Sequence, residues 1–124
     1  MFELEFYETY DGRVPVEEFL DSLDNKMSAK LVGMLELLEE KGQSLREPYS
    51  APLGDGIFEL RCKFGSNITR VLYFFYYGKR IIATNGFVKK TQKTPISEIK
   101  LAKTRRLDWI KRFEETSMKK QNME

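Results

Sequence analysis

The chain of 124 residues has the length of one domain, and its 41% hydrophobic and 32% charged residues are typical of a folded, soluble protein. It contains no histidine and one cysteine, Cys62, which excludes a Ser-His-Asp triad, a histidine general base, a disulfide framework and a multi-cysteine metal site. Because no apolar run is long enough to span a membrane and the acidic segment 1–5 does not resemble a signal peptide, we expect a cytoplasmic protein without a membrane partner.

The net charge of +2 conceals opposite charges in the two halves of the chain. Residues 1–50 contain 5 basic and 12 acidic residues, a net charge of −7, whereas residues 51–124 contain 16 basic and 7 acidic residues, a net charge of +9. A positive segment favours a polyanionic partner, because each phosphate that a cation neutralises releases counterions. The alternative is that these cations are ordinary solvated surface residues.

The first half of the chain predicts one strand followed by a helical hairpin. Residues 2–7 alternate between apolar and polar side chains, as in a half-buried strand. Pro15 suits the first turn of a short helix, and Asp24 or Asn25 can cap a second helix. The segment 42–56 is rich in glycine, proline and serine, and we expect it to be a loop.

The second half predicts three strands, at 56–64, 68–77 and 80–84, joined by short turns that make them antiparallel. In the first of these strands the apolar side chains, Cys62 among them, share one face, and Glu59, Arg61 and Lys63 point to the other. Thr94 and Pro95 read as the cap and first turn of a final helix, whose polar end after about residue 116 is expected to fray. The sequence therefore predicts a single α+β domain over 1–124, with the helices gathered over one face of a mostly antiparallel sheet.

The polar face of these strands and the segment that leaves the last strand concentrate positive charge. If helices cover the apolar face, Arg61 and Lys63 look out from an open sheet, and Arg70 lies in the next strand. Residues 85–93 add three lysines and Phe87. Cations for phosphates and a ring for stacking suit single-stranded RNA.

Each of these residues also has a structural interpretation. Arg61 can pair with an acid across the sheet, and Arg70 shares a strand face with apolar residues and can be a partly buried structural cation. Phe87 can belong to the core, and the lysines of 89–93 can be solvated. We expect Cys62 to be an inert core thiol.

Three segments resemble the Gp49-like, HigB-type branch of the RelE/ParE toxin superfamily. They are Gly56-Ile57-Phe58-Glu59-Leu60-Arg61, Arg70-Val71-Leu72-Tyr73-Phe74 and Gly86-Phe87-Val88-Lys89-Lys90-Thr91-Gln92-Lys93-Thr94-Pro95. The resemblance covers about residues 53–102, and the last segment is its most specific part. Many relatives have a histidine just before the Gly-Phe pair, where this chain has Asn85.

The resemblance implies a RelE-like fold and the toxin of a type II toxin–antitoxin system. Such toxins are endoribonucleases that cleave mRNA, usually on the ribosome, and so inhibit translation. A cognate helix-turn-helix antitoxin, similar to HigA, silences them, and the complex reaches operator DNA through that antitoxin. The alternatives are a ParE-like inhibitor of DNA gyrase and a basic nucleic-acid-binding regulator without catalysis.

RNA cleavage by its own 2′-hydroxyl requires a proton transfer and stabilisation of a phosphorane, which arginine and lysine can supply without a metal or cofactor. We therefore expect Arg61 and Arg70 to contact the phosphate and Lys89 or Lys90 to transfer protons or stabilise charge. Phe87 would stack on a base. Three further lysines would position the RNA backbone: Lys63, Lys79 and Lys93.

Overall fold

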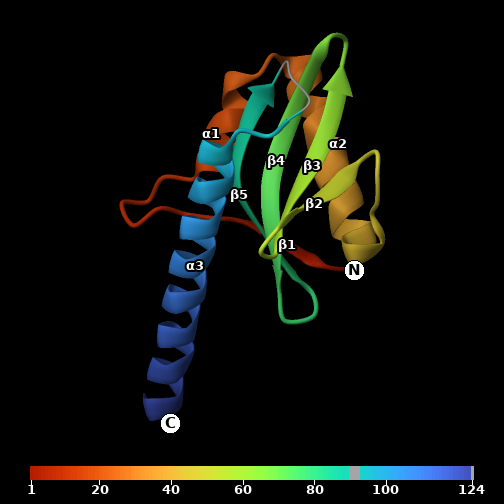
Figure 1. The fold of residues 1–124 in the computed structure, drawn as a ribbon. Coiled ribbons are helices and arrows are strands. Elements are labelled where there is room, and N and C mark those ends of the chain that lie inside the picture. The colour runs from red at the N-terminus through yellow and green to blue at the C-terminus, as the bar shows by residue number, and fades with distance from the viewer. Residues whose placement is uncertain (90–92, 124) are drawn as a thin grey trace.

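The computed structural model describes residues 1–89 and 93–123 of the chain (Figure 1). In chain order its elements are β1 (Glu3–Phe6), α1 (Pro15–Ser22), α2 (Asn25–Lys41), a 3-10 turn (Gly42–Ser44), β2 (Ser50–Gly54), β3 (Ile57–Phe64), β4 (Asn67–Tyr76), β5 (Arg80–Lys89) and α3 (Ile96–Met123). The strands form one sheet in the order β1-β5-β4-β3-β2, in which only β1 and β5 are parallel. The predicted α+β class, the helical hairpin after the first strand and the C-terminal helix are confirmed.

The helical hairpin forms where the sequence predicted it. The side chain of Asp24 accepts a hydrogen bond of 2.9 Å from the backbone N–H of Met27 and so caps α2. The hairpin packs its apolar side chains, including Val16 of α1 and Leu31 and Leu35 of α2, against one face of the sheet. None of the helices that the structure describes is long and apolar enough to cross a membrane.

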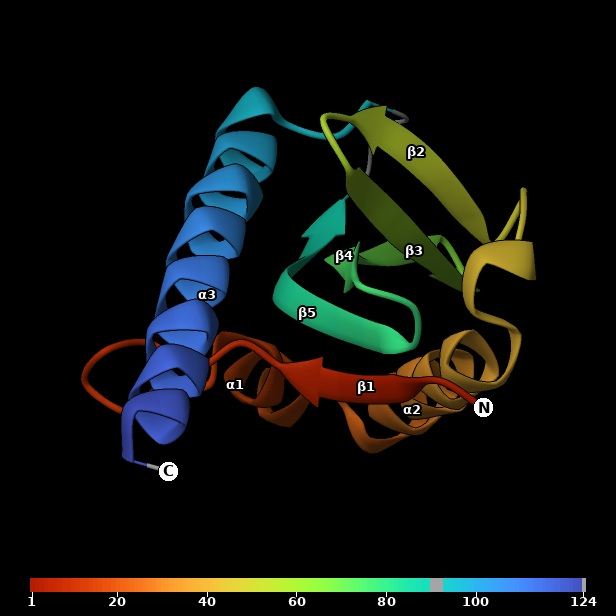
Figure 2. The ribbon, with the colours of Figure 1, turned by 90° about the horizontal axis from the view of Figure 1, so that it is seen from below.

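Helices cover both faces of the sheet, so the expectation that they gather over one face was wrong (Figure 2). Val71 and Tyr73 of β4 belong to the core under α1 and α2, whereas Leu72 and Phe74 belong to a second core under α3. A strand that is apolar on both faces needs cover on both, because either face left open would expose a large apolar surface to water. The unbroken apolar run of this strand is the sequence signal for the arrangement.

The sheet has one strand more than predicted. Within the segment expected to be a loop, Ser50–Gly54 forms the edge strand β2, which pairs with β3 as far as the Ser50–Leu60 pair. The glycine and proline content that predicted a loop is compatible with a short edge strand, since an edge strand tolerates residues that weaken a central one.

A β-bulge determines which residues of β5 face the third helix. The register between β4 and β5 shifts by one residue at Thr84. An extra residue reverses the alternation of side chains, so Asn85 and Phe87 lie on the α3 side of the sheet. The sequence predicted that this strand ends at Thr84, whereas it continues to Lys89.

Both ends of α3 differ from the prediction. The helix begins at Ile96, and the carbonyl of Pro95 accepts the first helical hydrogen bond, so Thr94 is not its cap. Thr94 turns its hydroxyl to the sheet instead. At the other end the helix continues to Met123, beyond the predicted fraying point, and its last turns project past the sheet (Figure 1).

Part of the positive charge of the second half holds α3 in place. Three arginines of the helix donate hydrogen bonds to backbone carbonyls outside it: Arg105 to Thr84, Arg106 to Asp55 and Arg112 to Glu8. The guanidinium of Arg106 also lies 5.7 Å from the centre of the Phe74 ring. These cations serve packing, so the positive segment is not a nucleic-acid surface along its whole length.

Candidate nucleic-acid interface

Arg61, Arg70 and Phe87 form one cross-strand row on the α3 side of the sheet. Arg61 of β3 pairs in register with Arg70 of β4, and Arg70 pairs with Phe87 of β5. The bulge at Thr84 creates this alignment, because without it Phe87 would point to the other face. Phe87 is partly buried and packs against the core under α3, so its ring is in part a core residue.

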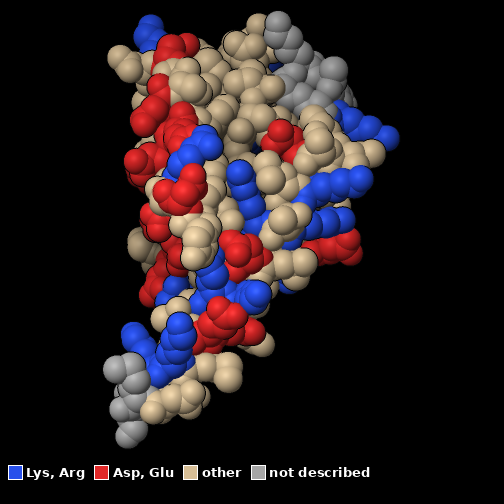
Figure 3. Space-filling view, turned by 90° about the vertical axis from the view of Figure 1, so that its left-hand side faces the viewer, with Lys and Arg blue, Asp and Glu red and all other residues tan. Residues whose placement is uncertain are grey.

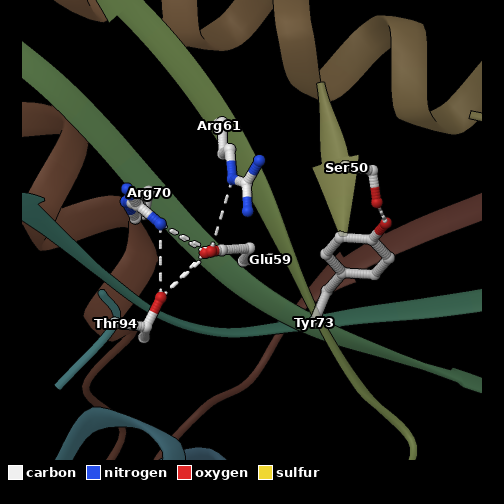
Figure 4. A network of polar contacts seen from close by, with 6 residues as sticks. All are labelled: Ser50, Glu59, Arg61, Arg70, Tyr73 and Thr94. Atoms are coloured by element: carbon white, nitrogen blue, oxygen red, sulfur yellow. Dashed lines mark hydrogen bonds and ion pairs between the residues drawn. The ribbon is translucent and has the colours of Figure 1, made fainter. Parts of the chain in front are cut away.

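Glu59 is the buried centre of the site (Figure 4). Its carboxylate is 0% exposed and accepts hydrogen bonds of 2.5 and 2.6 Å from Nη1 of Arg70 and of 2.8 Å from Oγ1 of Thr94. It also lies 3.5 Å from Nε of Arg61. The strand pattern placed Glu59 on a solvent-facing side, but Thr94 and the arginines close over it, and these partners compensate the cost of burying its charge.

The two arginines of the row have different environments. Arg70 is 3% exposed and its guanidinium is bonded to Glu59, as in the structural interpretation considered for it. The side chain of Arg61 is 32% exposed, and its buried Nε makes no hydrogen bond within the part of the chain that the structure describes. Because its side chain is partly exposed at the cleft, Arg61 can turn the end of its guanidinium to a ligand, whereas Arg70 contributes positive charge from beneath it.

A cleft of about 430 Å³ opens beside the row, along the edge of β3 that β2 leaves uncovered beyond Leu60. Its described lining contains four cations and no acidic residue, which favours an anionic ligand. The cleft brings together three residues that the sequence predicted for the site, Arg61, Lys63 and Arg70. The complete lining is Lys30, Met34, Pro48, Tyr49, Arg61, Cys62, Lys63, Ile68 and Arg70.

The other predicted lysines lie in different places. Lys93 is exposed in the segment before α3, next to Thr94, whose hydroxyl bonds to Glu59. Lys79 lies in the β4–β5 turn at the opposite end of the sheet, about 20 Å along β5 from the cross-strand row, and is not brought together with the cleft. Lys89 is the last residue of β5, and the prediction for Lys90 falls outside the described residues.

Asn85, at the position of the histidine that many relatives have, ties β5 to α3. It is 3% exposed, and its Nδ2 donates hydrogen bonds to Oε1 of Glu98 at 2.9 Å and to the Glu98 carbonyl at 3.3 Å. The side chain is not part of the cleft lining. Asn85 therefore fixes the start of α3 relative to the cross-strand row.

Tyr49 lies at the cleft, and Tyr73 lies in the core under α1 and α2. Tyr49 is 49% exposed at the cleft wall. Tyr73 is buried and its hydroxyl lies 2.5 Å from Oγ of Ser50 (Figure 4). Burial raises the pKa of Tyr73 above its ordinary value, so this phenol stays protonated.

Sequence reasoning missed Lys30 and Tyr49 as residues of the cleft. Lys30 belongs to α2, and its Nζ donates a hydrogen bond to the carbonyl of Lys63, a contact between residues 33 apart in the chain. Tyr49 precedes the strand that was expected to be a loop. Neither position carries a local signal, because the cleft depends on where β2 stops pairing with β3.

Acidic and basic side chains are partly separated on the face shown in Figure 3. Acidic side chains gather along the left margin of the upper part of this view and basic side chains lie toward its centre and right, whereas both kinds alternate over the lower part. Within residues 1–89 and 93–123, no group of three or more acidic or cysteine side chains is arranged to hold a metal ion.

Comparison with known proteins shows the family of the chain. Residues 18–107 match the family described as phage-derived protein Gp49-like. The chain is also 31% identical over 111 residues to the probable endoribonuclease HigB1 of Mycobacterium tuberculosis, in both strain CDC 1551 and strain H37Rv. These alignments cover 90% of this chain and 86% of the relative. The chain therefore belongs to the Gp49-like family and is related to the HigB-type toxins.

Proposed function

We propose that the chain is a single-domain, cytoplasmic toxin of a type II toxin–antitoxin system that cleaves mRNA on the ribosome and so inhibits translation. The observation that carries the proposal is Arg61: a partly exposed arginine at the rim of a positively charged cleft, held by a buried carboxylate. The name of the relative, a probable endoribonuclease, supports the same activity.

The reaction is attack of a ribose 2′-oxygen on the adjacent phosphorus, with departure of the 5′-oxygen of the next nucleotide. The guanidinium of Arg61 donates to the phosphorane oxygens and stabilises the negative charge that develops on them. Arg70 adds positive potential from its buried position and holds the carboxylate of Glu59 in place. Lys89 or Lys90 transfers protons or stabilises charge, and no metal or cofactor takes part in this scheme.

The remaining roles follow from position. Lys63 contacts the RNA backbone from the cleft, and Lys93 approaches it from the segment before α3. The ring of Phe87 stacks on a base at the far end of the row. The placement of Lys79 does not support contact with the same phosphate.

We further propose a helix-turn-helix antitoxin as the protein partner, through which the complex binds operator DNA. The basis is the relationship to HigB-type toxins. Expression of the chain alone should then arrest growth, and co-expression of a helix-turn-helix protein encoded beside it should restore growth.

Primer extension on cellular mRNA after brief expression tests the proposed function. A ribonuclease leaves new 5′ ends, and these should appear in translated messages and decrease when ribosomes are cleared from them. Growth arrest with intact mRNA and blocked replication would favour a gyrase inhibitor instead. Normal growth with intact mRNA, at high levels of folded protein, would favour a non-catalytic nucleic-acid-binding protein.

A further inference from the structure

We propose that the cleft wall formed by α2 and residues 48–49 binds the base of the nucleotide next to the phosphate at Arg61, with Tyr49 as its stacking surface. This inference rests on the proposed function and deepens it by adding a second base-binding position. The first, at Phe87, lies at the other end of the cross-strand row. Arg61 lies between the two.

The wall has the composition of a base-binding surface. Met34, Pro48 and Ile68 give it apolar sides, and the ring of Tyr49 is half exposed beside them. Sites for small ligands are mostly apolar with a few polar groups, and the volume of about 430 Å³ lies within their usual range of roughly 300–1,000 Å³. A flat aromatic base fits such a wall, and a stacked base contributes about 1–3 kcal/mol.

Cations frame the wall on the sides where a sugar-phosphate backbone would run. Lys63 and Arg61 come from β3, and Lys30 comes from α2. The Nζ of Lys30 donates to the Lys63 carbonyl and lies 5.8 Å from the centre of the Phe64 ring, so this side of the rim is held in place. An apolar wall framed by positive charge and free of acidic residues in the described lining fits a nucleotide better than a neutral ligand.

The open edge of β3 adds groups that can bond to the edge of a base. The N–H of Arg61 donates to the carbonyl of Tyr49 at 2.8 Å, which joins the wall to the strand. Strand alternation directs the N–H of Lys63 to the same side, beyond the end of β2. A peptide could also use a strand edge, but the four cations of the lining favour RNA.

The cross-strand geometry separates the two base positions. Arg61 and Phe87 lie two strands apart, about 10 Å, and the wall lies on the outer side of Arg61. A single strand that places its scissile phosphate on Arg61 would thus lay one flanking base toward Phe87 and the other against Tyr49.

The test is the affinity of purified full-length protein for an octamer of 2′-O-methyl RNA, which binds but lacks the attacking hydroxyl. Tyr49→Ala should bind about 5- to 150-fold more weakly, because a stacked base is lost. Tyr49→Phe and Tyr49→Trp should bind within about twofold of wild type, since the ring remains. Tyr10→Ala is the matched control, because Tyr10 is 95% exposed in the β1–α1 loop outside the cleft, and it should leave the affinity unchanged.

The dependence of affinity on salt distinguishes stacking from charge. Tyr49→Ala should leave the slope of log affinity against log salt unchanged, because the variant removes no phosphate contact. An affinity of Tyr49→Ala equal to wild type would overturn the subsite, and so would a Tyr49→Phe variant as weak as Tyr49→Ala. If Tyr49→Ala no longer binds the antitoxin encoded beside the chain but binds RNA as wild type does, the subsite is also overturned, since the wall would then hold a peptide.

Failure of the subsite and failure of the proposed function give different results. If wild type cleaves mRNA and Tyr49→Ala binds RNA normally, only the subsite is wrong. If wild type cleaves no mRNA but its RNA affinity depends on the ring at position 49, the subsite stands and the ribonuclease function is wrong.

Discussion

Arg61 and Arg70 lie directly opposite each other on antiparallel strands and both line the cleft, yet Arg70 is buried and Arg61 is partly exposed. Two like charges in this position repel, and the carboxylate of Glu59 beneath them supplies the compensating charge. In the proposed function the two arginines have different roles: Arg70 with Glu59 forms the base of the site, and Arg61 would present its guanidinium to the ligand.

Glu59→Gln should destabilise the protein by about 3–5 kcal/mol, because it leaves the buried Arg70 without its counter-charge. Chemical denaturation monitored by circular dichroism measures the effect. Glu18→Gln breaks an exposed Glu–Arg pair with Arg13 and is the matched control, expected to leave the denaturation midpoint nearly unchanged. Equal effects of the two substitutions would show that the buried pair has no special importance for stability.

Gly86→Ala should destabilise by about 1–3 kcal/mol. A Cβ on Gly86 would lie 2.4 Å from a ring carbon of Phe19, so α1 has to move away from β5. Gly33→Ala provides the control, because a Cβ there meets nothing within 4 Å and alanine favours the helix by up to about 1 kcal/mol. A Gly86→Ala protein as stable as wild type would contradict the close packing of α1 on β5.

The stability of the α3 packing should depend on pH through Asp108. The hydrogen bond from the hydroxyl of Tyr7, at 2.6 Å, lowers the pKa of Asp108 below its ordinary value, and Arg112 contributes in the same direction. A carboxyl with a lower pKa in the folded state stabilises that state at pH values above the unfolded pKa of about 3.9, and this contribution is lost as the pH falls through the folded pKa.

Thermal melting of wild type and Asp108→Asn between pH 7 and pH 3 checks this expectation. The wild type should melt higher at pH 7, and the difference between the two proteins should shrink toward pH 3. A difference that stays constant across this range would mean that the charge of Asp108 does not contribute to stability.

Local patterns in the sequence predicted much of the fold. Alternation in 57–64, the cap at Asp24 and the short turns between strands identified their elements, because these signals depend on neighbours in the chain. The position of α3 on the second face was missed, although Leu72 and Phe74 on the far face of β4 contained the signal. No local pattern in the sequence predicts the bulge at Thr84. The bulge nevertheless determines on which face of the sheet Phe87 lies.

The candidate site was predicted only in part, because some of its contacts join residues that are far apart in the chain. Strand alternation placed Arg61 and Lys63 together, and the structure has both in one cleft. The burial of Glu59 depends on Thr94, which is 35 residues away, and the cleft depends on a lysine of α2. Such contacts follow from the tertiary packing and not from spacing along the chain.

The central claim is that Arg61 acts on the phosphate and not on the fold, and one pair of measurements on Arg61→Ala tests it most directly. Its unfolding free energy should stay within about 1 kcal/mol of wild type, since the side chain is partly exposed and Glu59, with which it forms an ion pair at 3.5 Å, keeps its hydrogen bonds with Arg70 and Thr94. Single-turnover cleavage of ribosome-bound mRNA should slow about 100-fold, equal to about 2.7 kcal/mol. Arg61→Lys should restore little, because an ammonium lacks the two-pronged contact, and Arg13→Ala should cleave at the wild-type rate. A folded Arg61→Ala protein that cleaves as fast as wild type would contradict the account.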